Sequence, residues 1–329
     1  MLGLLNLFMV AIGFVVGVLS GFFGFGGGFI LTPLLISLGF PANISVGTSI
    51  VEISMSSLVN SLRHKFLGNV EAKVSLVAVF ASVLGSESGV QIIEYLKIFG
   101  TQYMSSVVSL AYAIILSFVS AYIIHESLAL KRGDCKKKNL FLRYKFSELK
   151  VPPLIAISRS NKEKISVWII ILIGFISGLF AGFLGSGGGS ILIPLLIYII
   201  GYEPSVAAGT CAFWVLLNSI YASLTHAVKG NIDIMLATLI FIGSLIGIQI
   251  GTTATKYVKK TRFELSLGLC LCFVSLSTLI KLFSGYPDLS SLSLLSPIIT
   301  FILASTVALF IIANLLKERQ RTRKIMRDR

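Results

Sequence analysis

Charge is scarce in this sequence. Only 13% of its 329 residues are Asp, Glu, Lys or Arg, about half the share that is typical of a soluble domain. Hydrophobic residues make up 55% and mean hydropathy is +0.91. Several apolar runs approach or exceed the roughly 20 residues that a helix needs to cross a bilayer. This composition excludes a soluble globular protein and predicts an all-α polytopic membrane protein.

Cysteine is also scarce, with four in the chain. Cys211, Cys270 and Cys272 lie in apolar segments and Cys135 lies in a basic one, a pattern that excludes a disulfide framework. We interpret all four as reduced packing residues. We predict that the chain is not an enzyme and that it holds no metal and no cofactor.

Acidic residues are half as numerous as basic ones, 14 against 28, which gives a net charge of +14. Residues 126–164 hold eleven basic and four acidic residues (+7), and 317–329 hold seven and two (+5). Basic segments beside membrane helices report topology through the positive-inside rule and can contact anionic lipid headgroups. Because their few aromatics form no recognisable motif, we predict contact with membrane lipids and no nucleic-acid partner.

The basic segments divide the chain into four parts. We predict a first transmembrane repeat over 1–125, a basic cytoplasmic linker over 126–164, a second repeat over 165–316 and a basic cytoplasmic tail over 317–329. The N-terminus has no Lys or Arg before Arg63, so we interpret it as a first membrane helix and not as a signal peptide.

We predict ten or eleven membrane segments. They are 3–20, 26–39, 43–66, 70–95, 103–125, 165–182, 187–201, 203–228, 232–256, 262–283 and 295–315. Segments 26–39 and 187–201 are short for full crossings. Each follows a glycine-rich stretch, which favours a broken or re-entrant helix.

The two halves repeat one ordered series of motifs. GFFGFGGGFILTPLL begins at Gly21, and GFLGSGGGSILIPLL begins at Gly182. Farther on, GFPANISVGTS matches GYEPSVAAGTC, and HKFLGNVE matches HAVKGNID. The series indicates an internal duplication. Two matching glycine pairs that follow are predicted to be helix-packing faces, Gly85 with Gly89 and Gly247 with Gly251.

Charge predicts how the two copies are oriented. If the linker is cytoplasmic and every segment crosses, then Arg63, Lys65, the KYVKKTR stretch at 256–262 and the tail are all cytoplasmic. Five crossings per repeat then make the second copy inverted relative to the first. Inverted repeats with paired broken helices are a signature of secondary transporters that work by alternating access.

The paired glycine clusters are the leading candidate site. Glycine allows a tight backbone at membrane depth, and the helix N-terminus that follows offers unpaired N–H groups and partial positive charge to an anion. For any single glycine, helix packing is the alternative role. For the pair of clusters we predict anion binding by Gly24, Gly26, Gly27, Gly28, Gly185, Gly187, Gly188 and Gly189.

Five polar residues are further candidate substrate ligands. VGTS and AGTC place Thr48, Ser49 and Thr210 early in the next helix of each half. Their hydroxyls can bond an oxyanion or cap the local backbone. Asn60 and Asn218 lie on long apolar helices, where they can line the same cavity or form interhelical hydrogen bonds.

Two histidines recur in the matching turns. His64 is followed by Asn69, and His226 is followed by Asn231. The spacing puts each at a helix end near a membrane surface. A structural turn is the favoured role, and a gate or a proton-responsive group is the alternative.

Two acidic residues break the repeat. Glu52 matches Trp214, and Glu87 matches Gln249. An ionised carboxylate at a helix centre costs about 2.5–3.5 kcal/mol on insertion scales, so both are candidates for proton coupling. Glu52 is favoured because it lies four residues after Thr48. The alternative is a protonated carboxyl that is hydrogen-bonded in a helix interface.

Other functions fit the motifs less well. LGSGGG around Ser186 superficially resembles the G-x-S-G of rhomboid proteases, but Leu184 replaces the first glycine, Phe25 replaces the serine in the other copy, and nothing places His226 as its base. A cation path would be lined by more acidic groups than the two above. The glycine clusters lack the lysine and the βαβ setting of a nucleotide-binding loop. A passive anion channel and a permease for carboxylates or other anions stay open as alternatives.

Taken together, the motifs resemble the TauE/SafE-type sulfite exporter family, also called TSUP permeases. The resemblance rests on the GxGGG cluster, the downstream proline, the GTS and GTC sites, the H-x-x-x-G-N turn and the duplication, over about residues 10–95 and 170–260. It implies a permease of a prokaryotic plasma membrane that exports a small anion, such as sulfite or a sulfoacetate-like organosulfonate. Two features depart from the family pattern: Glu87 stands where a small or apolar residue is expected, and the long basic linker is not needed for the transport function.

Overall fold

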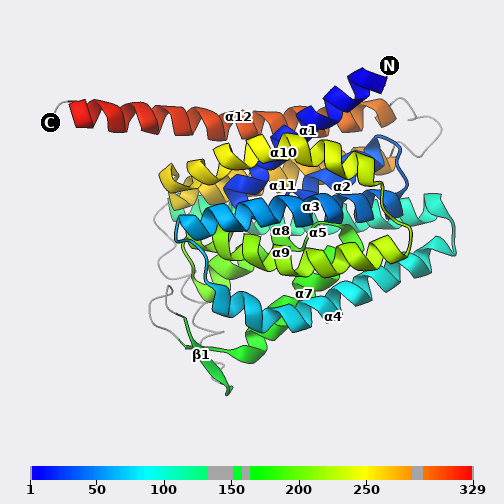
Figure 1. Cartoon of the computed structure of the whole chain (residues 1–329), viewed down its shortest axis with the longest axis horizontal. Helices are drawn as coiled ribbons and strands as arrows, with labels where there is room; N and C mark the ends of the chain where they lie inside the picture. Colours follow the sequence, from blue (N-terminus) through cyan, green and yellow to red (C-terminus); the bar gives the residue numbers. More distant parts are fainter. Residues whose placement is uncertain (1, 132–150, 158–163, 284–291, 328–329) are drawn as a thin grey trace.

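Helices form almost the whole of the computed structural model (Figure 1), which describes residues 2–131, 151–157, 164–283 and 292–327. The first half contains α1 (Leu2–Phe23), α2 (Gly28–Ser37), α3 (Ala42–Phe66), α4 (Ala72–Lys97) and α5 (Thr101–Lys131). The second half contains α7 (Val167–Leu184), α8 (Gly189–Leu195), the π-helical η2 (Leu196–Ile200), α9 (Pro204–Val228), α10 (Ile234–Ala254), the 3-10 turn η3 (Thr255–Tyr257), α11 (Lys260–Phe283) and α12 (Leu292–Arg327). Two short antiparallel strands, β1 (Leu154–Ala156) and β2 (Lys164–Ser166), precede α7.

The predicted all-α polytopic fold is confirmed. In the described part of the chain, eight helices are long and apolar enough to cross a membrane: α1, α4, α5, α7, α9, α10, α11 and α12. Helix α3 has 25 residues but lacks an apolar stretch as long as those of the eight. Most of its polar side chains are buried against other helices, so they need not face lipid. Helices α2 and α8, with ten and seven residues, are short elements, as the sequence predicted.

The predicted linker and tail meet the structure differently. Most of residues 126–164 lie outside the described residues, apart from the end of α5 and the two strands. The segment predicted as a separate tail from residue 317 instead continues α12 as one helix to Arg327 (Figure 1). Its sequence is rich in Lys, Arg, Glu and Gln, which are good helix formers, so the helix does not end where the apolar run ends.

Two pairs of helices pack closely through glycine. Helix α1 lies along α10, and α4 lies along α7. A Cβ atom on Gly17 would overlap the carbonyl of Ser244, and one on Gly178 would overlap the carbonyl of Ser82. The predicted packing faces are confirmed, because a Cβ on any of these glycines would overlap the backbone of the paired helix: Gly85, Gly89, Gly247 and Gly251.

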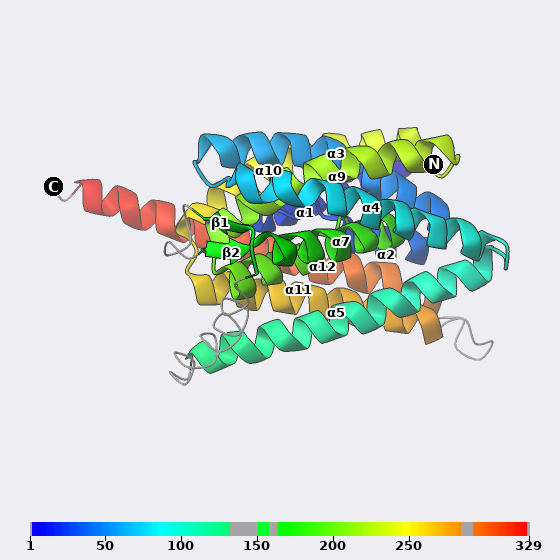
Figure 2. The same ribbon diagram turned by 90° about the horizontal axis from the view of Figure 1, so that it is seen from below.

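Helices that carry matching motifs run antiparallel. Thr48, near the start of α3, bonds to Asp233, which follows α9, and Thr210, near the start of α9, bonds to Glu71, which follows α3. Helices α5 and α11 are also antiparallel, because the Ser127 hydroxyl near the end of α5 donates to the Thr261 carbonyl at the start of α11. Figures 1 and 2 show the two helices side by side. Figure 2 shows α3 and α9 together on one face and α5 and α11 on the other. Antiparallel matching helices are what an inverted second copy requires.

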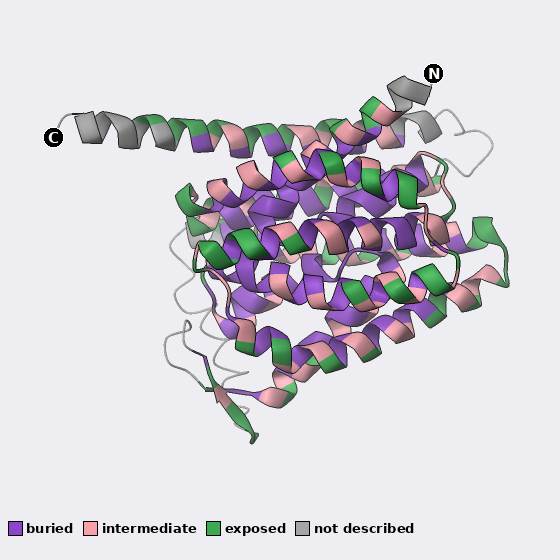
Figure 3. Cartoon of the chain, viewed as in Figure 1, coloured by how far each residue is buried: buried purple, intermediate pink, exposed green. Residues whose placement is uncertain are grey.

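The core lies around the short helices. Every residue of α2 is buried, and buried residues are also frequent on α3, α8, α9 and the segments that precede α2 and α8 (Figure 3). Helix α12 packs on α11 and α2. There the Ser277 hydroxyl donates to the carbonyl of Ser296 at 2.8 Å.

Candidate functional site

Two glycine loops break the helices at the centre of the fold. The first joins α1 to α2, and its Gly24, Gly26 and Gly27 have φ of 86°, 79° and 81°. The second joins α7 to α8 with the same conformation, with φ between 65° and 75° at Gly185, Gly187 and Gly188. Positive φ is accessible to glycine at little cost, which explains why each turn needs a glycine cluster. Gly27 and Gly188 are the N-caps of α2 and α8, and no side chain caps either helix.

The two loops are in direct contact. A Cβ on Gly28 would lie 2.5 Å from the Gly185 carbonyl oxygen, and one on Gly189 would overlap Phe25. The Thr32 hydroxyl of α2 donates to the same Gly185 oxygen at 3.2 Å. The predicted glycine clusters, 161 positions apart in the sequence, therefore meet in the core.

Sequence reasoning missed three residues that hold or line this junction. The Tyr112 hydroxyl of α5 lies 2.5 Å from the Leu184 carbonyl oxygen and 3.5 Å from that of Gly28, so it links both loops. Ile53 of α3 contacts both loops. Ser57, one turn farther along α3, places its hydroxyl 3.1 Å from the Cβ position of Gly26. Tyrosine, isoleucine and serine are ordinary on membrane helices, and their spacing carried no signal.

The Ser57 hydroxyl is fully buried and has no hydrogen-bond partner among the described residues. Buried hydroxyls in folded proteins are nearly always hydrogen-bonded, so an orphaned one is expected to meet water or a ligand. Its position against a glycine loop makes Ser57 the polar side chain best placed to meet a ligand there.

Two of the predicted hydroxyl ligands bond to distant backbone. Thr48 Oγ1 accepts a hydrogen bond from Asp233 N at 2.9 Å, and Thr210 Oγ1 accepts one from Glu71 N at 3.0 Å. Each threonine therefore fixes a turn of the other half, a role that differs from the local capping considered from the sequence. Ser49 is fully buried, and its hydroxyl has no partner in the described part of the chain.

The predicted amide ligands form interhelical hydrogen bonds. Asn60 Nδ2 donates to the Ser20 carbonyl oxygen at 2.8 Å, and Asn218 Oδ1 accepts from the Ser86 hydroxyl at 2.6 Å. Within the described ranges, Asn60 Oδ1 and Asn218 Nδ2 keep no partner. Each side chain thus joins two helices and leaves one polar atom unsatisfied.

Both histidines cap helices that precede the glycine loops. The Nε2 atoms of His64 and His226 donate to the carbonyl oxygens of Gly21 and Gly182, both at 3.2 Å. These carbonyls lie in the last turns of α1 and α7, where no intrahelical N–H is available. The histidines are buried, which agrees with the favoured structural role.

The two asparagine turns differ. Asn231 is fully buried, and its side chain joins Asn43, Glu94 and His226. Asn69 is partly exposed, and its backbone N–H donates to the His64 carbonyl at 2.9 Å.

The two acidic candidates occupy different environments. Glu52 is fully buried on α3 beside the hydroxyls of Ser244 and Ser56, yet within the described residues neither carboxyl oxygen has a hydrogen bond of good geometry. Glu87 is only partly buried and accepts hydrogen bonds from Gln91 at 2.5 Å and Tyr221 at 2.8 Å. Of the two, Glu52 is the orphaned carboxyl in the core.

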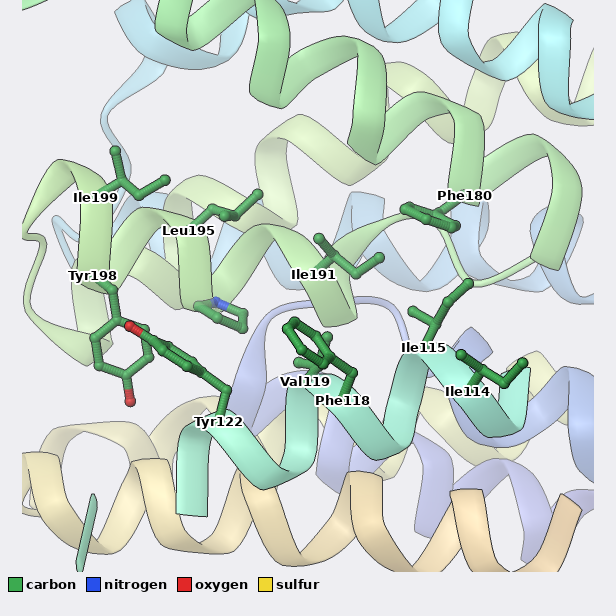
Figure 4. Close-up of a pocket in the computed structure, with 11 residues that line it drawn as sticks. Ile114, Ile115, Phe118, Val119, Tyr122, Phe180, Ile191, Leu195, Tyr198 and Ile199 are labelled. Carbon is green, nitrogen blue, oxygen red and sulfur yellow. The ribbon is translucent and has the colours of Figure 1, made fainter. Parts of the chain in front are cut away.

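A cavity of about 590 Å³ lies between α5 and α8–η2 (Figure 4). Its walls are aliphatic and aromatic, with Phe118, Phe180 and Ile191 among them, and the two tyrosines Tyr122 and Tyr198 stand at one end. It has no cationic lining residue, which makes it a poor site for an anion. Over residues 2–131, 151–157, 164–283 and 292–327, no three His, Cys, Asp or Glu side chains group to hold a metal ion.

Comparison with known proteins gives a consistent result. The model of the family described as "Sulfite exporter TauE/SafE" matches residues 9–278. The chain is 23% identical over 274 residues to "Probable membrane transporter protein YunE" of Bacillus subtilis, covering 81% of this chain and 94% of that protein. It is 28% identical over 246 residues to "Probable membrane transporter protein YjnA" of the same organism, covering 74% and 88%. "Sulfite exporter TauE/SafE family protein 2" of Arabidopsis thaliana is 29% identical over 119 residues, covering 35% and 25%.

Proposed function

The chain belongs to the sulfite exporter TauE/SafE family, and from this premise we propose that it is a secondary transporter of a small anion, with sulfite or an organosulfonate as its substrate. The family is one of membrane transporters, and the fold has the helices of a multi-pass membrane protein. We further propose a prokaryotic plasma membrane as its location and export as its direction.

One observation carries the proposed binding site. Two glycine loops meet in the core at the starts of α2 and α8, with the orphaned Ser57 hydroxyl against them. Helix N-termini and glycine backbone favour anions. A buried hydroxyl without a partner supplies a donor for an oxyanion. We therefore place the substrate between the two loops, with Gly26, Gly27 and Gly187 as backbone ligands and Ser57 as a side-chain ligand.

The proposed mechanism is alternating access between two inverted halves. The antiparallel course of α3 and α9 and of α5 and α11 supports this arrangement. Lys65 at the end of α3, Lys131 at the end of α5, Lys256 after α10 and Lys317 on α12 fit one common end, which we assign to the cytoplasm. Movement of one half against the other would then open the loops to each side in turn.

The test of the function is flux of radiolabelled sulfite into proteoliposomes that contain the purified chain. We expect saturable uptake that accelerates when unlabelled sulfite is preloaded inside, because a carrier returns faster when loaded. Protein-free liposomes are the control. Uptake that rises linearly with sulfite concentration and ignores preloading would indicate a passive channel, and no uptake of sulfite or of organosulfonates would contradict the substrate class.

We also propose that Glu52 couples transport to protons. It is a fully buried carboxyl on the helix that contacts the glycine loops through Ile53 and Ser57. Glu52→Gln keeps the shape of the side chain and removes the titratable proton. We expect this variant to lose the acceleration of sulfite flux by an imposed pH gradient, while Glu87→Gln, at the partly exposed carboxyl, keeps it. Undiminished gradient dependence in Glu52→Gln would remove Glu52 from the mechanism.

A further inference from the structure

A polar pocket lies at the end of the molecule where α3 ends and α9 begins. It has a volume of about 440 Å³, and its lining includes Asn69, Ser205, Lys256 and Lys260. Glu203 also contributes to the wall. Amide, hydroxyl and ammonium groups are all hydrogen-bond donors, so this lining can surround an oxyanion.

At the opposite end, the matching residues bond to one another. Asn43 Nδ2 donates to Asn231 Oδ1 at 2.9 Å, and Asn231 Nδ2 donates to Glu94 Oε1 at 2.8 Å. Glu94 also pairs with Lys97 at 2.7 Å. This chain of bonds, the Asn231 latch, joins the start of α3 to the ends of α4 and α9 around one buried asparagine.

The motif alignment explains why only one end has the latch. It pairs Asn69 with Asn231, Ser205 with Asn43, and Lys256 with Glu94. Serine is too short to reach the asparagine as Asn43 does, and lysine cannot accept the hydrogen bond that Glu94 accepts. The same three positions therefore bond to one another at one end and present free donors to a pocket at the other.

The pocket is also connected to the glycine loops. Ser205 lies one helical turn before Ala208 on α9, and a Cβ on Gly24 would overlap the Ala208 carbonyl. The hydrogen bond from Glu71 N to Thr210 Oγ1 fixes the turn that carries Asn69 to the same helix. One stretch of α9 thus contacts both the pocket and the first glycine loop.

Charge favours an anion in this pocket. Lys260 lies 3.8 Å from Glu264, whereas Lys256 is exposed and makes no ion pair with another described residue. A concave site with an unpaired ammonium raises the local concentration of anions. The opposite end carries Glu94 at the same position, where it is paired with Lys97 and offers no free cation.

We propose that this pocket is a receiving site for a small oxyanion, bound by Asn69, Ser205 and Lys256, on the way to the glycine loops. The proposal rests on the proposed function and adds a second, outer site to it. In this proposal the Asn231 latch keeps the matching residues at the opposite end bonded to one another, and substrate enters from the Lys256 end.

The first test measures binding without transport. Val258→Cys, at a lining residue that is not a proposed ligand, in a chain whose four native cysteines are replaced by alanine, is modified with N-ethylmaleimide in phosphatidylcholine nanodiscs. Sodium sulfate is the probe, with sodium chloride at equal ionic strength as the control. We expect sulfate to slow the modification, and Lys256→Gln to raise the half-protecting sulfate concentration about tenfold, because a hydrogen bond to a charged group is lost.

Lys97→Gln is the matched control, because Lys97 lies at the latch end and already pairs with Glu94. It should leave the protection by sulfate unchanged. Equal modification rates in sulfate and chloride would overturn the receiving site, and normal sulfite flux in the wild-type chain would show that the proposed function survives. Protection that requires phosphatidylglycerol in the nanodisc and ignores sulfate would assign the pocket to lipid headgroups and overturn the proposal as well.

The second test transplants the latch and does not depend on the cysteine variant. Ser205→Asn/Lys256→Glu copies the residues of the latch end onto the Lys256 end. We expect its sulfite KM to rise at least about tenfold, since the cation is lost and the asparagines bond to each other. Lys259→Gln, at an exposed lysine near the same helix end that has no role in the proposal, is the control for general damage. An unchanged KM in Ser205→Asn/Lys256→Glu would contradict the receiving site.

Discussion

Helices α3 and α9 occupy matching places in the two halves, and they share a framework but not a chemistry. Each carries a threonine that ties down the other half's turn and a histidine that caps the helix before a glycine loop, with nearly identical distances. Between these shared contacts α3 buries Glu52, and α9 buries Trp214. The Trp214 indole donates to the Ser82 hydroxyl at 3.3 Å, while the Glu52 carboxyl keeps no good hydrogen bond in the described residues.

The difference shows which half carries the unsatisfied chemistry. On α3, polar atoms of five residues are buried without partners in the described structure: Ser49, Glu52, Ser57, Asn60 and His64. On α9, only Asn218 keeps such an atom in the same residues. A buried polar group without a partner costs about 1–3 kcal/mol. A chain that keeps several on one helix is therefore expected to use them, whereas α9 is expected to serve packing.

The largest expected effect contrasts the indole with the carboxyl. Trp214→Ala removes one of the largest fully buried side chains, so we expect the free energy of unfolding to fall by about 3–5 kcal/mol. Glu52→Gln removes no volume and should leave thermal unfolding in detergent, followed by circular dichroism, nearly unchanged. Trp168→Ala is the control, because that tryptophan is 58% exposed. Equal losses for both tryptophans would show that α9 is not the packing helix.

An intermediate loss of stability is expected when either of the two matching histidines is replaced. His64→Leu and His226→Leu each leave a helix-terminal carbonyl without its donor, at a cost of about 1–3 kcal/mol. We expect His226→Leu to be the more destabilising, because His226 Nδ1 also lies 3.4 Å from Asn231 Nδ2 in the Asn231 latch. Thermal unfolding of both variants in one detergent measures the order. A larger loss for His64→Leu would contradict the view that the latch end is the more tightly bonded one.

The smallest stability effect sharpens the contrast between satisfied and orphaned hydroxyls. Ser49→Ala removes a hydroxyl that has no partner in the described residues, so the unfolding temperature should stay the same or rise slightly. Ser219→Ala, on α9, removes a hydroxyl that donates to the Leu216 carbonyl at 3.2 Å. It should cost about 0.5–1.5 kcal/mol. A larger loss of stability for Ser49→Ala than for Ser219→Ala would contradict the view that the Ser49 hydroxyl is unsatisfied.

Local patterns were enough to predict the helices, the two short elements and the existence of the glycine loops. Apolar runs and glycine clusters act over a few residues, so spacing alone reports them. The bonds of Thr48 and Thr210 to turns of the other half were not predicted, whereas the interhelical hydrogen bonds of Asn60 and Asn218 were among the alternatives that the sequence left open. Only the arrangement of helices decides between them.

Contacts between distant segments could not be predicted. Tyr112 reaches the carbonyl of Leu184 across 72 positions, and nothing in the sequence around either residue marks the pair. The Asn231 latch likewise depends on Asn43 and Glu94, which lie in different helices. The motif alignment contained the signal for the Lys256 end, because Asn43 and Glu94 are replaced by Ser205 and Lys256, but its meaning depends on knowing that the three positions touch.

The most direct test of the central claim is sulfite flux through a chain whose glycine loops are filled. Gly27→Leu/Gly188→Leu puts side chains at two helix N-caps where φ is positive, so thermal unfolding must first show that the variant folds. Ser57→Ala is the second variant, with Ser219→Ala as its matched control on α9, and it changes almost no volume. We expect saturable sulfite flux in the wild-type chain and in Ser219→Ala, its loss in the folded glycine variant, and a raised KM in Ser57→Ala. Wild-type kinetics in both the glycine variant and Ser57→Ala would contradict an anion site between the two glycine loops.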